Sequence, residues 1–284
     1  MEILVLPAAA HVIEPNRVPM DYDENAELKL DVVRIWRLRR DGAVVHVASR
    51  QQRLITALAI RGPCLRSYLI GLLWPECPES KALESLRVSI HVASRQVPGL
   101  IVNDGRLLSI STRVEIDLHR VQAAIRALHD DQQDANASVY LRELRDAELL
   151  PGWYEDWVVS AQVRLTQDRL SAFLLFAERS LERGNPLLAE AAAAMAVEIE
   201  PLHENAVRLL LTAQMQQGNP AAALRAYERY RKQLESDFGI GPAASIKGLI
   251  TDSLTGHGLR RTEHLPSNGA PWRQGSPTSP VTPA

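Results

Sequence analysis

Cationic, hydroxyl and apolar side chains follow one another at helical spacing between residues 79 and 95. The candidate contact positions on one side of this segment are Lys81, Ser85, Arg87, Val88, His91 and Arg95. Arginine and lysine can donate to guanine, serine can bond either kind of base edge, and valine can contact the methyl group of thymine. Such a side suits a helix that lies in the major groove of DNA. Ser80 and Lys81, near its start, could instead hold a phosphate on free helix N–H groups.

The rest of this segment decides how its helix must be oriented. Apolar residues recur at a 3-4-3-4 spacing typical of a core-facing stripe, at Leu83, Leu86, Ile90, Ala93 and Val97. We predict a helix from about Glu79 to Arg95 that stops at Pro98-Gly99. Glu84 and Val92 then share the outward side and Ser89 lies at its flank. Two alternatives stay open, because a few charges also suit a solvated helix and the outward valines also suit a protein contact.

The residues before this helix indicate a hairpin and two further helices. Apolar positions alternate from Leu28 onward and are interrupted by Asp41-Gly42, which is a strong hairpin signal. Ser49 is a plausible N-cap for a helix that ends at Gly62-Pro63. A second, short helix is expected from about residue 66 to residue 73.

A smaller hairpin follows the long helix. Its strands are expected at residues 100–102 and 107–110, around Asn103-Asp104-Gly105, with Arg106 at the tip. Arg106 could enter a minor groove, although a solvated turn residue explains it equally well. The order of strands, helix, helix, turn, longer helix and hairpin is that of a winged helix-turn-helix, and a generic α+β domain is the alternative.

The charge of the chain is unevenly distributed. The net charge is −2 overall, but it is −5 for residues 1–28, +7 for residues 29–120 and −4 for residues 121–284. Such asymmetry indicates a polyanionic partner for the basic segment, which is where the winged helix is expected. A basic surface that only aids solubility is the alternative.

The second half of the chain carries an internal repeat. Gly-Asn-Pro occurs at residues 184–186 and again at 218–220, 34 residues apart, which is the period of a tetratricopeptide repeat. Alanine-rich runs follow both copies, and small residues at helical spacing let neighbouring helices approach closely. We expect helices at residues 117–129, 138–147, 156–183, 187–200, 204–217, 220–236 and 243–254. The pattern predicts an all-α binding scaffold without a catalytic centre.

Aromatic residues gather just before the longest of these helices. Trp153 and Trp157 are four residues apart and would share one face of a helix. We predict that these two residues and Tyr154 anchor the start of the long helix against the repeats. An aromatic ligand site is the alternative.

Several of these residues together resemble a known family. The first set is Asp41-Gly42, Arg53-Leu54, Leu69-Ile70, Leu73-Trp74-Pro75, Ser85-Leu86-Arg87 and Ile116-Asp117-Leu118. It resembles the OmpR-like DNA-binding domain of the SARP-type transcriptional regulators of actinomycetes. The second set is the run 149–158, Leu-Leu-Pro-Gly-Trp-Tyr-Glu-Asp-Trp-Val, and Gly239-Ile240-Gly241-Pro242. It looks like the bacterial transcriptional activator domain of the same regulators.

The resemblance implies an α+β winged helix-turn-helix followed by an all-α tetratricopeptide-like domain. In such regulators the third helix reads direct repeats in double-stranded promoter DNA, which allows a homodimer, and the repeats contact RNA polymerase or a sigma factor. The expected domains are an N-terminal arm (1–28), a winged helix (29–116), an activator domain (117–255) and a disordered tail (256–284). One departure is Val92-Ala93-Ser94-Arg95, where the family has an arginine-rich run. Fewer cations predict weaker, less salt-sensitive binding.

Other classes of function find little support in the residues. No phosphate-binding Gly-x-x-x-x-Gly-Lys-Ser/Thr loop occurs, so we expect no enzyme and no cofactor. Two cysteines and scattered histidines give no metal spacing, and they fit a reducing cytoplasm. The sequence contains no run of about 18 apolar residues, so we expect no membrane span. The alternative function is a non-enzymatic interaction module whose winged helix no longer binds DNA strongly.

Overall fold

The computed structural model describes residues 26–130 and 136–251. The chain divides into two compact units between Phe176 and Ala177, and each is described by itself below. The predicted arm lies outside the described residues except for residues 26–28, and the predicted tail, 256–284, lies wholly outside them. The predicted domain limits of 29–116 and 117–255 stay predictions.

The first unit begins with a four-stranded sheet. Its strands are β1 (Leu28–Asp31), β2 (Arg37–Arg40), β3 (Ala43–Val45) and β7 (Val114–Ile116) in the order β3-β2-β1-β7. Asp41 and Gly42 have φ angles of 48° and 80°, which are the two positive values that a type I′ hairpin turn requires. The parallel pairing of β7 with β1 was not predicted, since a three-residue strand far along the chain has no local signal.

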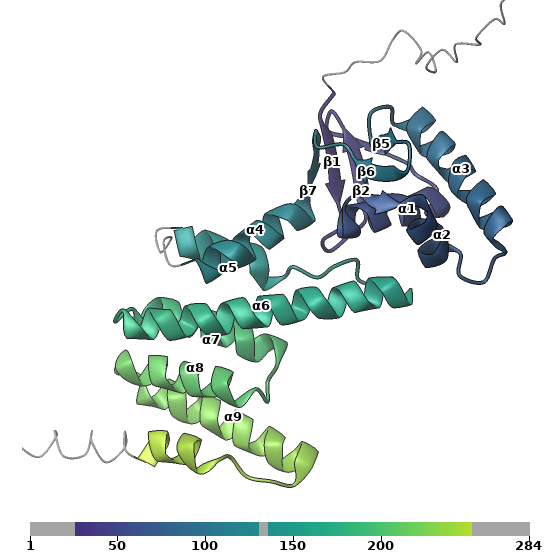
Figure 1. Ribbon diagram of the computed structural model, residues 1–284. Coiled ribbons are helices and arrows are strands. Elements are labelled where there is room, and N and C mark those ends of the chain that lie inside the picture. The colour runs from purple at the N-terminus through teal and green to yellow at the C-terminus, as the bar shows by residue number, and fades with distance from the viewer. Residues whose placement is uncertain (1–25, 131–135, 252–284) are drawn as a thin grey trace, which may run out of the picture. The chain divides into compact units, whose positions relative to one another are not determined.

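Three helices and a small hairpin complete a winged helix (Figure 1). The helices are α1 (Ser49–Arg61), α2 (Arg66–Leu73) and α3 (Glu79–Gln96). A second sheet of β4 (Cys64–Leu65), β6 (Leu107–Ile110) and β5 (Ile101–Asp104), in that order, forms the wing. The predicted order of elements is confirmed. The predicted N-cap is wrong, because Ser49 is the first helical residue and Ala48 precedes it without a side-chain cap.

Three helices follow β7. They are α4 (Asp117–His129), α5 (Ala137–Arg145) and the long α6 (Asp156–Glu182). Arg169 of α6 is buried and donates from Nε to the carbonyl oxygen of Leu144 at 2.7 Å and from Nη2 to that of Arg145. Because these carbonyls lie at the end of α5, Arg169 ties α5 to α6. Burial lowers the pKa of the Arg169 guanidinium below its ordinary value.

The second unit contains the repeats. It holds the end of α6, then α7 (Pro186–Ile199), α8 (Glu204–Gln216), α9 (Pro220–Phe238) and a helix over residues 244–251. Asn185 and Asn219 each accept a hydrogen bond from the backbone N–H of the third residue of the helix that follows, and a proline occupies the first helical position. The repeated tripeptide is thus a helix start signal.

The alanine runs that follow each tripeptide form the core of the second unit. The buried members are Ala189, Ala192, Ala193, Ala196, Ala223, Ala226 and Tyr230. The predicted all-α, tetratricopeptide-like arrangement is therefore confirmed. Within residues 26–130 and 136–251 no helix has both the length and the apolar content that a membrane span needs.

Leu86 tests the packing of α3. It lies at 0% exposure in the middle of the buried side of the helix, so we expect Leu86→Ala to lower the free energy of unfolding of the winged helix by about 2–5 kcal/mol. Urea denaturation followed by circular dichroism measures this change. Leu83→Ala, at a half-buried position one residue from the buried Ala82, is the control and should cost clearly less. Equal costs would show that α3 packs with a different side inward.

Candidate nucleic-acid interface

Helix α3 turns a narrow side toward the core. Its buried residues are Ala82, Leu86, Ser89 and Ala93, whereas Leu83 and Ile90 are only half-buried. The prediction for Ser89 was wrong: this residue is fully buried, and its hydroxyl donates to the carbonyl oxygen of Ser85 at 2.8 Å. That hydrogen bond satisfies the hydroxyl within the helix, so a small polar residue can occupy a core position without another partner.

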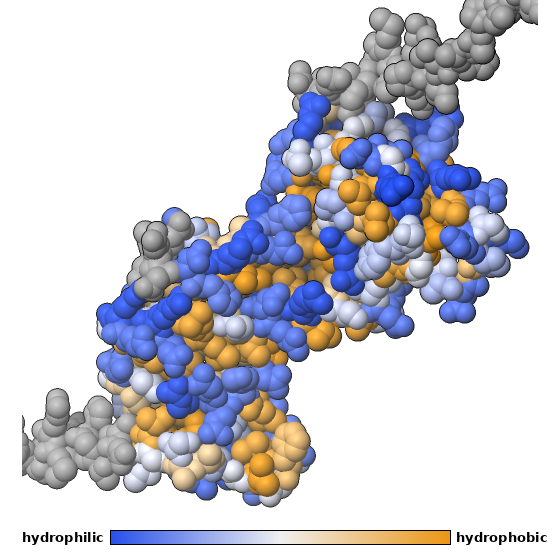
Figure 2. All heavy atoms as spheres, in the orientation of Figure 1, coloured by the Kyte–Doolittle hydropathy of each residue, from blue (hydrophilic) through white to orange (hydrophobic). Residues whose placement is uncertain are grey.

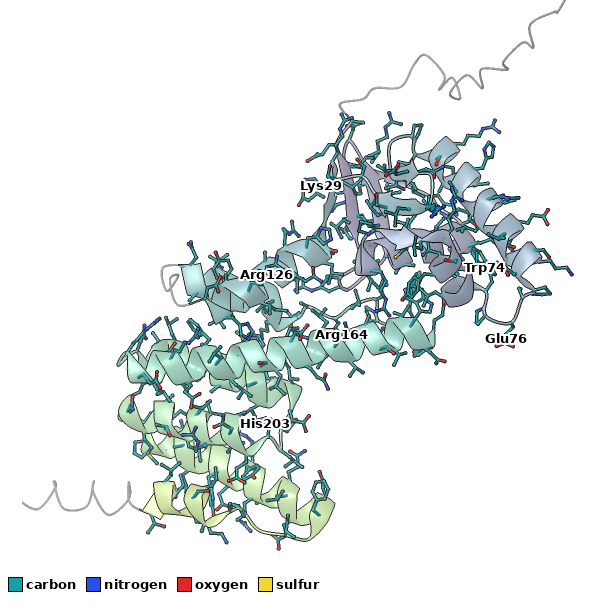
Figure 3. The ribbon with its side chains drawn as sticks, viewed as in Figure 1. Lys29, Trp74, Glu76, Arg126, Arg164 and His203 are labelled. Carbon is teal, nitrogen blue, oxygen red and sulfur yellow. The ribbon has the colours of Figure 1, made fainter. Side chains whose placement is uncertain are left out.

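The structure places the predicted contact residues of α3 together on its outward side. Lys81, Arg87, Val88, His91 and Arg95 are exposed, and Ser85 is half-buried. Val92 is half-buried too, so it belongs to the edge of the outward side and not to its middle. Figure 3 shows side chains that project from α3 away from the other elements of the winged helix. Figure 2 shows hydrophilic and hydrophobic residues mixed over this unit.

The cations on this side are not neutralised within the part of the chain that the structure describes. Lys81, Arg87 and Arg95 form no ion pair there, with Glu84 or with any other acid. Other arginines of residues 29–120 are engaged in ion pairs; for example, Asp31 pairs with both Arg37 and Arg39 at 2.9 Å. Lys81, Arg87 and Arg95 on α3 and Arg106 on the wing are therefore among the exposed cations that remain available to a polyanion.

The beginning of α3 offers unpaired backbone donors. Pro78 precedes the helix and provides no side-chain cap, so within the described chain no capping side chain occupies the first N–H groups. The turn before it contains Trp74 at the end of α2 and Glu76, which points away from the fold in Figure 3. This geometry suits the phosphate contact predicted at Ser80 and Lys81.

The wing is held by a residue that the sequence analysis missed. Arg66, the first residue of α2, donates from Nε to the carbonyl oxygen of Gly105 at 3.1 Å and from Nη2 to Oδ1 of Asn103 at 2.9 Å. Its backbone N–H also donates to the carbonyl oxygen of Arg106. Arg106 itself is exposed at the tip, where Gly105 has a φ of 57°. Arg66 thus fixes the wing relative to α2 and leaves Arg106 projecting.

A charged network joins the winged helix to the start of α6. Arg53 of α1 donates from Nε and Nη2 to the carboxylate of Glu155, with distances from 2.7 to 2.9 Å, and also donates from Nη2 to the carbonyl oxygen of Leu73 at 2.9 Å. The indole N–H of Trp157 donates to the same carboxylate at 2.8 Å. The bidentate contact orients both partners in a way that a single hydrogen bond does not.

The prediction for the aromatic cluster needs correction. Trp153 precedes α6 and so shares no helical face with Trp157, and Tyr154 is 85% exposed. Only Trp157 is buried, at 8% exposure, and its polar contact is with Glu155, the partner of α1 residue Arg53. The structure thus ties Trp157 to Glu155 and through it to the winged helix, and an anchor against the repeats stays a prediction.

A second connection runs from β1 to the segment before α6. The carboxylate of Asp117 accepts hydrogen bonds from the backbone N–H groups of Val32 at 2.9 Å and Val33 at 3.0 Å. Val33 also forms a bridge with Leu149, and the N–H of Leu150 donates to the carbonyl oxygen of Val32 at 2.9 Å. Desolvation by burial raises the pKa of Asp117 above its ordinary value of 3.8.

No group of three His, Cys, Asp or Glu side chains among residues 26–130 and 136–251 is placed to hold a metal ion.

Comparisons with known proteins give the class. Residues 116–252 match the family model of the bacterial transcriptional activator domain. The chain is 27% identical over 244 residues to the regulatory protein AfsR of Streptomyces coelicolor and 28% identical over 247 residues to that of Streptomyces griseus. These alignments cover 81% and 82% of this chain but 24% and 25% of the relatives, so the chain spans about a quarter of their length.

A solved structure shows the same fold. The structure of Mycobacterium tuberculosis EmbR in complex with a low-affinity phosphopeptide matches with a TM-score of 0.61 and 21% identity, over 81% of this chain and 66% of that one. A winged helix joined to a bacterial transcriptional activator domain defines a class of bacterial transcriptional regulators. Residues 116–252 carry a bacterial transcriptional activator domain, and the chain is similar to transcriptional regulators of the SARP type.

The Asp117 contact can be tested by replacing the carboxylate with an amide. Asp117→Asn keeps one acceptor but turns an NH₂ group toward the second N–H, so we expect it to cost about 1–3 kcal/mol of unfolding free energy. The raised pKa of Asp117 adds a pH dependence. Folded wild type binds more protons than the unfolded chain between pH 3.8 and the raised pKa, so its stability falls as pH rises through that window. Because asparagine does not titrate, the stability of the Asp117→Asn variant lacks this pH dependence.

The cost of Asp117→Asn should therefore be largest in acid and smaller above the window. Urea denaturation of both proteins across a pH series measures it. A cost that grows as pH rises would contradict the direction of the shift.

The Arg53–Glu155 contact calls for a double-mutant cycle. Both side chains are 31% exposed, so solvent screens the pair and we expect a coupling free energy of only about 1 kcal/mol. The variants are Arg53→Ala, Glu155→Ala and the double replacement, compared by urea denaturation. Arg120 and Glu115, an ion pair with more exposed side chains, form the control cycle and should couple less. A coupling of zero for Arg53 and Glu155 would show that the contact contributes nothing measurable to stability.

Proposed function

We propose that this regulator binds double-stranded promoter DNA in a sequence-specific manner, with α3 in the major groove. The supporting observation is that Lys81, Arg87 and Arg95 project from the outward side of α3 and form no ion pair within the described chain. A cation without a carboxylate partner binds phosphate or guanine without first losing an internal contact. The proposed contact residues are Lys81, Ser85, Arg87, Val88, His91 and Arg95 on α3 and Arg106 on the wing.

The finer parts of the proposal come from the family. The chain acts as an activator, reads direct repeats as a homodimer, and uses its helical repeats to contact RNA polymerase or a sigma factor. It works in the cytoplasm and does so by binding, so no catalytic step is required of it. The low number of cations on α3 implies a modest electrostatic contribution to affinity.

A salt series on promoter DNA tests this function. The probe is the duplex upstream of the protein's own gene, and the variants are Lys81→Ala and Arg95→Ala in the full chain. Both side chains are exposed, so their loss should change stability by no more than about 0.5 kcal/mol. If each contacts a phosphate, each variant should lower the slope of log affinity against log salt by about one.

Arg126→Ala is the matched control. It removes an exposed cation from α4, away from α3 in Figure 3, and should leave the slope unchanged. Equal slopes for wild type, Lys81→Ala and Arg95→Ala would place the contact surface elsewhere. A wild-type chain that folds but binds no duplex at low salt would favour an interaction module that does not use DNA.

A further inference from the structure

Val88 is an apolar side chain in the middle of the outward side of α3. It is 47% exposed, and the residues one turn away on that side are polar: Glu84, Ser85 and His91. Valine is a weaker helix former than alanine because its branched side chain loses freedom against the preceding turn. Local stability and core packing therefore give no reason for a valine here.

The surroundings of Val88 distinguish between two kinds of partner. An apolar protein contact is normally a patch of several apolar side chains. Of the positions one turn from Val88, only Val92 is apolar, and it is half-buried. Lys81, Arg87 and Arg95 stand along the same side with no ion pair in the described chain. A single apolar side chain on a polar side that also carries cations suits a nucleic-acid groove, because phosphates line the edges of such a groove and an apolar group can lie on its floor.

In DNA that apolar group is the C5 methyl of thymine, which lies in the major groove and which no other standard base carries. We propose that Val88 reads one thymine in each half-site through contact with this methyl group, so that Val88 determines sequence specificity. The inference rests on the proposed function, because it requires α3 to lie in the major groove. The inference assigns one base, thymine, to one residue, Val88, whereas the proposed function only places α3 in the major groove.

Uracil substitution tests the contact directly, since deoxyuridine lacks only the methyl group. Duplexes are first selected from a random pool with the full chain. In a selected duplex, thymines are then replaced one at a time by deoxyuridine, and affinities are measured for wild type and Val88→Ala. Burial of one methyl group corresponds to about a fourfold change in an equilibrium constant.

We expect one thymine per half-site whose replacement weakens wild-type binding about fourfold. Val88→Ala should bind the thymine and uracil duplexes equally, with an affinity close to that of wild type for the uracil duplex. Val88→Thr keeps a methyl group at the same position and should retain part of the discrimination. Val139→Ala, at a valine of similar exposure (49%) on α5, is the matched control and should discriminate as wild type does.

Three results would overturn the inference, and they are distinguishable. Persistence of the thymine preference in Val88→Ala would assign the methyl contact to another residue. Absence of any uracil-sensitive position in wild type would show that no thymine methyl is read. Failure of the folded wild-type chain to select any duplex would overturn the proposed function together with this inference. Thermal melting of each variant checks that lost discrimination does not reflect unfolding. Because Val88 is exposed, we expect its variants to stay folded.

Discussion

The guanidinium of Arg53 joins three parts of the first compact unit. Its five N–H donors point in fixed directions, and the structure uses them to bind α1 to the last carbonyl of α2 and to Glu155 at the start of α6. Solvent reaches this pair, so its contribution to stability is small. Its importance is geometric: the end of α2 leads directly into the turn before α3, and a fixed end of α2 fixes where the outward side of α3 begins. Trp157 donates to the same carboxylate, which shields one side of the contact and connects it to a buried residue.

The contact between β1 and the segment before α6 is more deeply buried and costs more to form. Arg34 and Leu150 have φ angles of 69° and 44°, a region that residues other than glycine rarely adopt. Each donates its N–H across this contact, Arg34 to Glu148 and Leu150 to Val32. Asp117 holds the strand from the other side, and its burial raises the cost of its charge. The winged helix and the beginning of the activator domain therefore share hydrogen bonds within one compact unit, which explains why the structure divides at Phe176 and not at the end of the winged helix.

Sequence reasoning succeeded where a local signal determines the structure. Asp41-Gly42 requires two positive φ angles and forms the predicted turn, and the Gly-Asn-Pro repeats start α7 and α9 as expected. It failed where packing, the exact start of a helix or distant residues decide. As a polar residue, Ser89 was expected at the flank of α3, but its hydroxyl bonds within the helix and it is buried. Trp153 has helical spacing to Trp157, although α6 begins three residues after Trp153. Arg53, Arg66 and Asp117 carried no signal of their roles, because each acts on backbone or side-chain groups at least 20 residues away. Which of the proposed contact residues touch DNA stays a prediction.

The distribution of charge matters for the proposed binding of a polyanion by a chain with a net charge of −2. Asp31 pairs with Arg37 and Arg39, and Glu155 pairs with Arg53, so these cations serve the fold. The unpaired cations of α3 are few, and Glu84 stands among them. Because each phosphate contact contributes to affinity for every sequence alike, a surface with few such contacts depends more on the edges of the bases. Because the end of α3 is not arginine-rich, the proposed interface depends less on attraction to phosphates and more on discrimination between base sequences. In that interface, the contact proposed for Val88 contributes to the choice of sequence.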